Sequence, residues 1–196
     1  MTSPKLTSLC VFCGANTGSR AIYRDSAAIL GRALATNRTE LVYGGGRVGM
    51  MGAVADGVLA GGGKVTGVIP GFLVDKELAH PGASDLIVVP DMHTRKREMF
   101  ERSEAFCVLP GGVGTLEEMF EVVTWRQLRR HNKPIVLLNI DGYWSHLVSL
   151  MERIVEEGFM HHGHSALVTV VARPEDVIGT IEAELAAPKP PVAFKV

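Results

Sequence analysis

Apolar and polar positions alternate along this chain in two patterns. Short uninterrupted apolar runs, typical of buried parallel strands, are each followed by a longer segment with apolar residues at helical spacing. These patterns predict strands at residues 9–13, 40–43, 64–69, 86–89, 105–109, 134–138 and 167–170, and helices at about 20–35, 50–59, 92–103, 115–130, 143–157 and 174–186. With no internal repeat or linker, we expect one α/β domain over residues 1–196: a doubly wound, Rossmann-like parallel sheet with helices on both faces. The tail from about residue 187 is proline-rich, and we expect it to be loose.

A glycine turn joins the apolar run at residues 105–109 to the helix after it. Gly111, Gly112 and Gly114 let the backbone approach a ligand closely, and Thr115 is a good cap for the helix that follows. In an open parallel sheet this junction lies at the carboxyl edge of the strands, where ligands bind. The start of the helix favours an anion, most often phosphate.

Two acidic residues, Glu117 and Glu118, follow this predicted anion site. In the first turn of a helix they would complement its dipole, which is a purely structural role. Alternatively, one of them faces a sugar carbon on which positive charge develops during a reaction. Composition alone leaves both interpretations open.

A second glycine loop follows the apolar run at residues 40–43. Gly44, Gly46 and Gly49 fit the dinucleotide pattern G-x-G-x-x-G, but the next strand ends without the acidic residue that would bind a ribose. Two glycine loops after separate strands fit one mononucleotide better, with one loop at the phosphate and the other near the base or sugar. The alternative is that these glycines only permit tight turns and close packing.

A cluster of cations lies where a helix is predicted to start, at Arg95, Lys96 and Arg97. Helix starts disfavour cations, so a bound anion would offset the cost of this placement. The structural alternative is ordinary solvated surface charge.

The segment Pro-Gly-Gly-x-Gly-Thr-x-x-Glu at residues 110–118 closely resembles the signature of the LOG ("Lonely Guy") family. Its members are phosphoribohydrolases that release cytokinin bases from their nucleoside 5′-monophosphates. Gly44–Gly46 and the Met-His-x-Arg-Lys segment at residues 92–96 are similar to two further family segments. The resemblance implies hydrolysis of the N-glycosidic bond of AMP or of N6-substituted AMP by a homodimer, with no metal or cofactor.

The resemblance also implies roles for single residues. Arg95 and Glu118 correspond to catalytic residues, and Glu117 corresponds to a contact with the sugar. The other substrate-binding positions that it implies are Glu77, Lys96, Gly45, Gly46, Gly111, Gly112, Val113, Gly114, Thr115, Leu116 and Thr124. Ala15 and Asn16 depart from the serines that many members carry in the first turn.

Two other functions are considered. Molybdenum-cofactor carriers resemble this fold and its glycine loops, but a non-catalytic carrier has no need of a carboxylate such as Glu118 beside a phosphate. Members of the family are also labelled lysine decarboxylases. That reaction needs a lysine bound to pyridoxal phosphate, and no sequence context marks one.

The net charge and the composition of the chain limit the classes of partner that it could bind. The net charge of −1 over 196 residues argues against binding to nucleic acid or to a membrane surface. Charged residues interrupt every apolar run before it could span a bilayer, and the N-terminus does not resemble a signal peptide. We therefore expect a cytoplasmic protein with a small nucleotide as its ligand. The resemblance to the LOG family suggests a homodimer with the helical segment 117–130 near its interface, and the apolar Trp125 and Leu128, beside three arginines, are consistent with this.

Two apparent metal motifs are interpreted as structural. Cys10 and Cys13 spell C-x-x-C, but residues three apart in a strand point to opposite faces, so the two thiols could not share an ion. His161, His162 and His164 have no acidic or cysteine partner at ligand spacing, and we expect a solvated loop there.

Overall fold

The computed structural model of this protein describes residues 4–74, 79–160 and 167–187. Within these ranges one parallel sheet contains seven strands: β1 (Ser8–Phe12), β2 (Glu40–Tyr43), β3 (Val65–Pro70), β4 (Asp85–Val89), β5 (Ala105–Val108), β6 (Ile135–Leu138) and β7 (Thr169–Val171). Their order across the sheet is β4-β3-β2-β1-β5-β6-β7, and every neighbouring pair is parallel. The doubly wound α/β fold is therefore confirmed. Glu77, the histidines 161–164 and the proline-rich tail lie outside the described residues.

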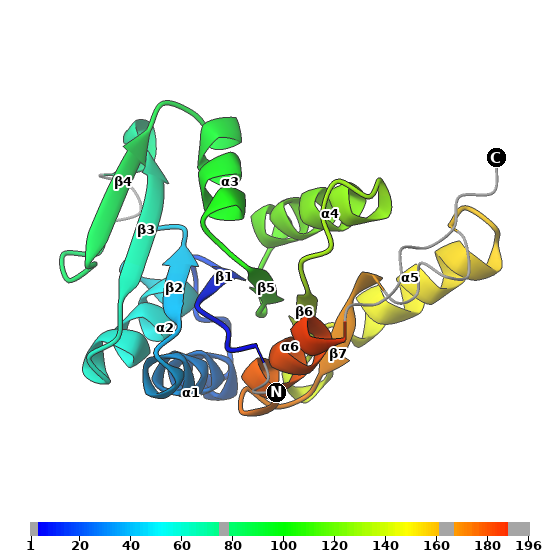
Figure 1. Cartoon of the computed structure of the whole chain (residues 1–196), viewed down its shortest axis with the longest axis horizontal. Coiled ribbons are helices and arrows are strands. Elements are labelled where there is room, and N and C mark those ends of the chain that lie inside the picture. Colours follow the sequence, from blue (N-terminus) through cyan, green and yellow to red (C-terminus); the bar gives the residue numbers. More distant parts are fainter. Residues whose placement is uncertain (1–3, 75–78, 161–166, 188–196) are drawn as a thin grey trace.

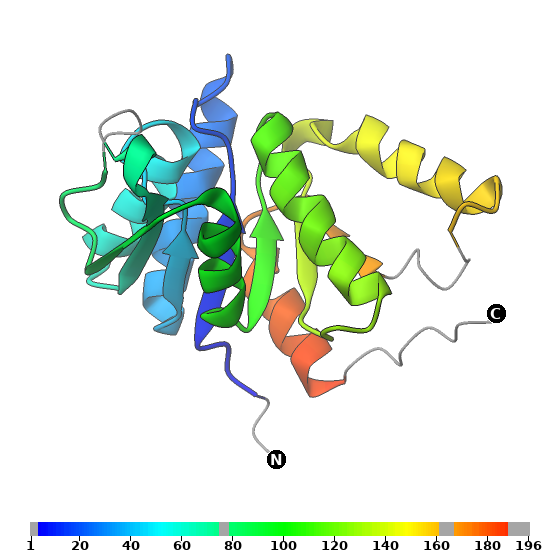
Figure 2. The same cartoon turned by 90° about the horizontal axis from the view of Figure 1, so that it is seen from above.

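Helices cover both faces of this sheet. They are α1 (Ala21–Asn37), α2 (Gly49–Ala60), α3 (Met92–Glu101), α4 (Val113–Gln127), α5 (Ser145–Glu156) and α6 (Asp176–Ala186). In Figure 1, α1, α2 and α6 lie below the sheet, and α3 and α4 lie above it. Helix α5 runs out beyond the strands, which Figure 2 shows from above. None of these helices, in the part of the chain that is described, is both long and apolar enough to cross a bilayer.

Each face of the sheet has its own hydrophobic core. Leu9, Leu41 and Leu30 belong to the cluster on the α1–α2 face, whereas Phe106 and Leu137 belong to the cluster beneath α3 and α4. Burying one such side chain contributes about 1.5–3 kcal/mol, which explains why strands covered on both faces have uninterrupted apolar sequences.

The two cysteines of the C-x-x-C segment lie in different cores. Cys10 packs in the α3–α4 core and Cys13 in the α1–α2 core. Both are buried and free. The expectation that these thiols point to opposite faces is confirmed.

The direction in which the strands are added reverses between β1 and β5. The chain proceeds from β1 outward to β4, and it then returns through α3 to β5 on the other side of β1. Connections that diverge from adjacent strands leave a crevice at their carboxyl ends. The loops that follow β1 and β5 are therefore the expected walls of a ligand site.

Candidate active site

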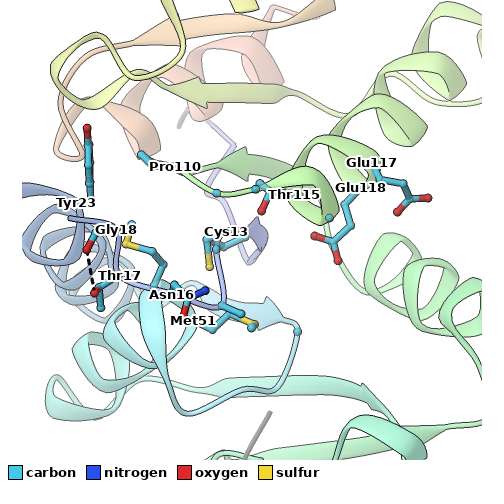
Figure 3. A pocket seen from close by; sticks show the side chains of 18 of the residues that line it. Cys13, Asn16, Thr17, Gly18, Tyr23, Met51, Pro110, Thr115, Glu117 and Glu118 are labelled. Atoms are coloured by element: carbon cyan, nitrogen blue, oxygen red, sulfur yellow. Dashed lines mark hydrogen bonds between the residues drawn. The ribbon is translucent and has the colours of Figure 1, made fainter. Parts of the chain in front are cut away.

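A cavity of about 500 Å³ opens at this reversal point (Figure 3). Its walls come from the loops after β1, β2 and β5, from α3 and α4, and from Tyr143 in front of α5. This volume is in the usual range for a small-molecule site. The cavity therefore lies where the topology predicts a ligand.

The glycine loop, residues 110–115, carries the start of α4 into this cavity. Gly112 is the N-cap residue, with φ −97° and ψ −155°, and no side chain caps the helix. The expectation that Thr115 caps the helix is wrong, because α4 begins two residues earlier, at Val113. Thr115 is instead buried on the first turn, with its Oγ1 against Gly111. The uncapped N–H groups and the helix dipole make this end of α4 suitable for an anion.

Glycine is present at the positions of this loop for different structural reasons. A Cβ on Gly111 would overlap Thr115 Oγ1, so close packing alone explains that glycine. A Cβ on Gly112 or Gly114 would meet nothing within 4 Å, and neither residue has a positive φ. Packing within the described chain therefore does not explain Gly112 and Gly114, and the space beside them is open.

Glu117 and Glu118 lie in the second turn of α4 and not in the first, where we expected them. The favourable effect of the dipole falls off within the first turn, so it does not account for either carboxylate. Figure 3 shows Glu118 extending toward the cavity, while Glu117 extends farther out. Both residues line the cavity, and Glu118 is the deeper of the two.

Lys96 neutralises the outer of these two acids. Its side chain is only 8% exposed, and its ammonium group contacts Glu117 Oε1 and lies 3.2 Å from Glu121 Oε1. Burial alone would lower the pKa of Lys96, but hydrogen bonds and charge from the two carboxylates outweigh it, so this pKa is raised. Lys96 therefore stays protonated and fixes the position of Glu117.

Arg95 is held by two backbone carbonyls. Its guanidinium is almost fully buried; Nε donates to the Val68 carbonyl at 3.1 Å and Nη2 donates to the Gly44 carbonyl at 2.9 Å. Asp91 supports the helix that carries it, because Asp91 Oδ1 caps α3 by accepting from the Thr94 N–H at 2.7 Å. These two hydrogen bonds hold the positive charge of Arg95 in a fixed position at the cavity wall.

Comparison with known proteins identifies the family. A family model described as "Possible lysine decarboxylase" matches residues 51–181. The cytokinin riboside 5′-monophosphate phosphoribohydrolase LOG5 of Arabidopsis thaliana is 43% identical over 175 residues, which cover 89% of this chain and 77% of that protein. Its paralogue LOG3 is 42% identical over 182 residues, covering 93% of this chain and 85% of that protein. The chain belongs to the LOG family.

Solved structures show that the LOG fold is shared more widely. The molybdenum cofactor carrier protein of Chlamydomonas reinhardtii superposes with a TM-score of 0.71 at 22% identity, over 92% of this chain and 99% of that chain. The molybdenum cofactor binding protein of Rippkaea orientalis gives a TM-score of 0.69, also at 22% identity, over 92% of this chain and 98% of that chain. These similarities concern the fold alone.

The structure brings together part of the residue set that the LOG signature implies. Arg95, Gly111, Gly112, Gly114, Thr115, Glu117 and Glu118 line the cavity. Val113, Leu116 and Thr124 lie on α4 outside its lining, and Lys96 reaches the site through Glu117. Glu77 is outside the described residues.

In the second glycine loop, the cavity wall is formed by Gly44 rather than by the two glycines that follow. Gly45, with φ +82°, accepts from the His80 N–H at 2.9 Å, and Gly46 forms an isolated bridge with Ala79. Both are buried behind the wall. Through these two contacts, Gly45 and Gly46 connect the second glycine loop to the segment that begins at Ala79.

Several lining residues carry no signal that sequence reasoning could use. Tyr23 and Tyr143 come from α1 and from the turn before α5, and their rings meet edge to face at 5.5 Å. Met51 and Met92 occupy helical apolar positions, which are usually core. Only the tertiary fold brings these side chains to the cavity.

Proposed function

We propose that this LOG protein hydrolyses the N-glycosidic bond of AMP or of N6-substituted AMP, releasing the free base and ribose 5-phosphate. The observation that carries the proposal is the placement of Glu118 and Arg95 in the same cavity as the uncapped start of α4. The relatives from Arabidopsis thaliana, named for this activity on cytokinin riboside 5′-monophosphates, support it.

The first step of the proposed mechanism is anchoring of the phosphate. The uncapped N–H groups at the start of α4 lie beside the open space at Gly112 and Gly114, and the Thr115 hydroxyl, against Gly111, lines the same cavity. Charge-assisted hydrogen bonds from these groups hold the phosphate and thereby fix the position of the ribose. A remote anchor of this kind converts binding energy into orientation of the reacting bond.

The second step is cleavage at C1′. The C1′–N bond breaks, with its electron pair going to the base, and water forms the new C1′–O bond; the water gives up one proton and the base takes up one, so that neutral base and ribose 5-phosphate are released. The Glu118 carboxylate stabilises the positive charge that develops on C1′ or takes a proton from the water, as carboxylates do in glycoside hydrolysis. Because Lys96 neutralises the charge of Glu117, the role assigned to Glu117 is contact with the sugar.

Arg95 acts on the leaving base. A guanidinium holds its protons too firmly to be an ordinary general acid, so its role is to donate hydrogen bonds and to offset negative charge on the base. The Val68 and Gly44 carbonyls orient it before the substrate arrives. Such preorganised charge stabilises the transition state most where water is excluded.

The test is chromatographic detection of free base from AMP, from N6-isopentenyl-AMP and from the two matching ribosides. Loss of the phosphate anchor is expected to lower kcat/KM by a factor on the order of 10³. Glu118→Gln is expected to abolish turnover with AMP binding and melting temperature nearly intact, whereas the exposed Glu101→Gln keeps wild-type rates. Equal rates on nucleotide and riboside would refute the anchor, and wild-type turnover by Glu118→Gln would refute its catalytic role. Release of no base from any purine nucleotide would favour a carrier.

We also infer that the functional unit is a homodimer. Helix α5 has an apolar stripe at Leu147, Met151, Ile154 and Val155, of which only Val155 is buried, and Leu150 beside it is 53% exposed. An amphipathic helix covered so incompletely is typical of an interface. Static light scattering at micromolar concentration should give twice the chain mass, and a monomeric mass would contradict the inference.

Helix α4 supplies further candidates for this interface. Leu128 is 54% exposed and Phe120 is 37% exposed. Trp125 is a poorer candidate than we expected, because its ring packs edge to face on Phe100 at 5.0 Å within the same chain. We therefore propose Phe120 and Leu128, rather than Trp125, as the α4 residues at the interface.

We place this activity in the cytoplasm. Cys10, Cys13 and Cys107 are all free and buried, and burial raises the pKa of each thiol. Free thiols are typical of a reducing compartment.

A further inference from the structure

Successive carbonyls of the glycine loop are each held by a hydrogen bond. The Pro110 carbonyl accepts from the Gly14 N–H at 3.1 Å, and the Gly112 carbonyl accepts from the Leu116 N–H at 3.1 Å. Between them, the Gly111 carbonyl accepts from the hydroxyl of Tyr143 at 2.6 Å. Two of these donors are backbone groups, and only the middle one is a side chain.

Holding a carbonyl also orients the N–H of the next residue. In a planar trans peptide the C=O and the N–H point in opposite directions, and no cis peptide occurs in the described residues. The Tyr143 bond to Gly111 therefore turns the Gly112 N–H to the side opposite Tyr143. Among the described residues, the Gly111 and Gly112 N–H groups donate to no protein oxygen, which leaves them available to a ligand.

A tightly bonded turn places Tyr143 on the loop. Asn139 Oδ1 accepts from the Trp144 N–H at 2.7 Å, and Asp141 and Gly142 both have positive φ, at 48° and 75°. Asp141 also forms an ion pair with Arg20, at the start of α1. Contacts from α1 and from β6 thus determine where the hydroxyl lies.

We propose that Tyr143 is a positioning residue for the substrate phosphate. Its hydroxyl fixes the Gly111–Gly112 peptide and so presents the Gly112 N–H to the phosphate, although the hydroxyl itself does not take part in bond cleavage. This inference deepens the proposed function and rests on the assignment of the glycine loop as the phosphate site. It adds a residue that the LOG signature segments do not contain.

The test is Tyr143→Phe, which removes the hydroxyl and keeps the ring packed on Tyr23. Loss of one hydrogen bond of ordinary strength is expected to weaken AMP binding by about 3- to 10-fold in calorimetry. Adenosine binding should not change, because adenosine has no phosphate. In turnover, kcat/KM should fall by the same factor for the monophosphate and stay constant for the riboside.

The matched control is Tyr43→Phe. The Tyr43 hydroxyl is buried, has no hydrogen-bond partner in the described structure and does not line the cavity. This variant should bind AMP and adenosine as the wild type does, so it reports the general effect of losing a tyrosine hydroxyl.

The outcomes separate the two proposals. Equal weakening of AMP and adenosine binding by Tyr143→Phe would assign the residue a merely structural role, and unchanged AMP binding would show that the bond positions nothing. Either result overturns the inference. If the wild-type protein releases no base, the proposed hydrolase function fails, but the binding comparison still decides the role of Tyr143.

Discussion

Replacement of Gly44 by alanine tests the position of Arg95 without changing Arg95 itself. A Cβ on Gly44 would overlap Arg95 Nη2 and would lie 2.9 Å from Met51 Sδ and 3.3 Å from Arg95 Cζ. The φ of Gly44 is not positive, so its backbone accepts an alanine. The strain therefore falls on two side-chain ends, and the guanidinium must leave the Gly44 carbonyl.

The size of the effect follows from this geometry. To restore ordinary contact the guanidinium must move by roughly 1 Å, a misplacement that costs about 10²-fold in rate. Complete removal of a charge-stabilising donor costs about 10²–10³-fold, which Arg95→Ala should show as the upper bound. The effect on folding is limited to the hydrogen bond that is lost, because the displaced atoms lie at the ends of flexible side chains. Loss of one hydrogen bond from a charged group destabilises by about 1.5–3 kcal/mol.

The assay combines kcat/KM on AMP with thermal unfolding. Gly179→Ala is the control, because Gly179 lies exposed within α6 with nothing within 4 Å of its added Cβ. That variant should keep full activity and gain up to about 1 kcal/mol in stability. Full activity in Gly44→Ala would mean that the position of Arg95 does not matter, and the catalytic role proposed for Arg95 would have to be abandoned. Failure of Gly44→Ala to fold would assign Gly44 to packing.

Two further predictions concern the phosphate site and pH. Gly112→Ala should fold normally, because its Cβ meets nothing within 4 Å, yet bind AMP roughly tenfold more weakly; unchanged affinity would show that no ligand approaches there. His131 donates from Nε2 to the Val122 carbonyl and accepts the Lys133 N–H at Nδ1, and burial holds its pKa below 6.5. The neutral ring is therefore favoured in the folded state, so stability is complete above about pH 6.5 and is lost as pH falls below it, by about 1.4 kcal/mol per unit of pKa lowering. Urea unfolding between pH 5 and 7.5 should show this slope, and it should disappear in His131→Gln.

The central strands of the sheet could be predicted from sequence because they are buried on both faces. Runs such as Ala105–Val108 and Ile135–Leu138 are uninterrupted apolar segments, which is the pattern of a strand covered on both faces. The start of α4 was harder to predict. Its N-cap is Gly112, whose backbone conformation alone begins the helix, while Thr115 has the side chain that usually marks a cap.

The site could be predicted only where one segment carries several of its groups. Glu118 and Thr115 share one helix and one motif, so the sequence could place them together. The partners of Arg95 could not be predicted, because the Gly44 carbonyl lies in the loop after β2, the Val68 carbonyl lies in β3, and neither carries a sequence signal. For the same reason the sequence gives no indication of Tyr143, whose contact with Gly111 spans 32 residues of the chain.

The periodicity of α4 separates the residue beside the proposed phosphate site from the acid that is proposed to act on the sugar. Thr115 and Glu118 are three residues apart, so they share a face of the helix, with Glu118 about 4.5 Å farther along the axis. In the proposed mechanism, the phosphate at the start of α4 puts the sugar near Glu118. Glu117 is rotated about 100° around the same helix, and there Lys96 neutralises it. In the proposed mechanism the phosphate is bound at the uncapped start of α4, whereas bond cleavage needs an acid one turn later on the same face.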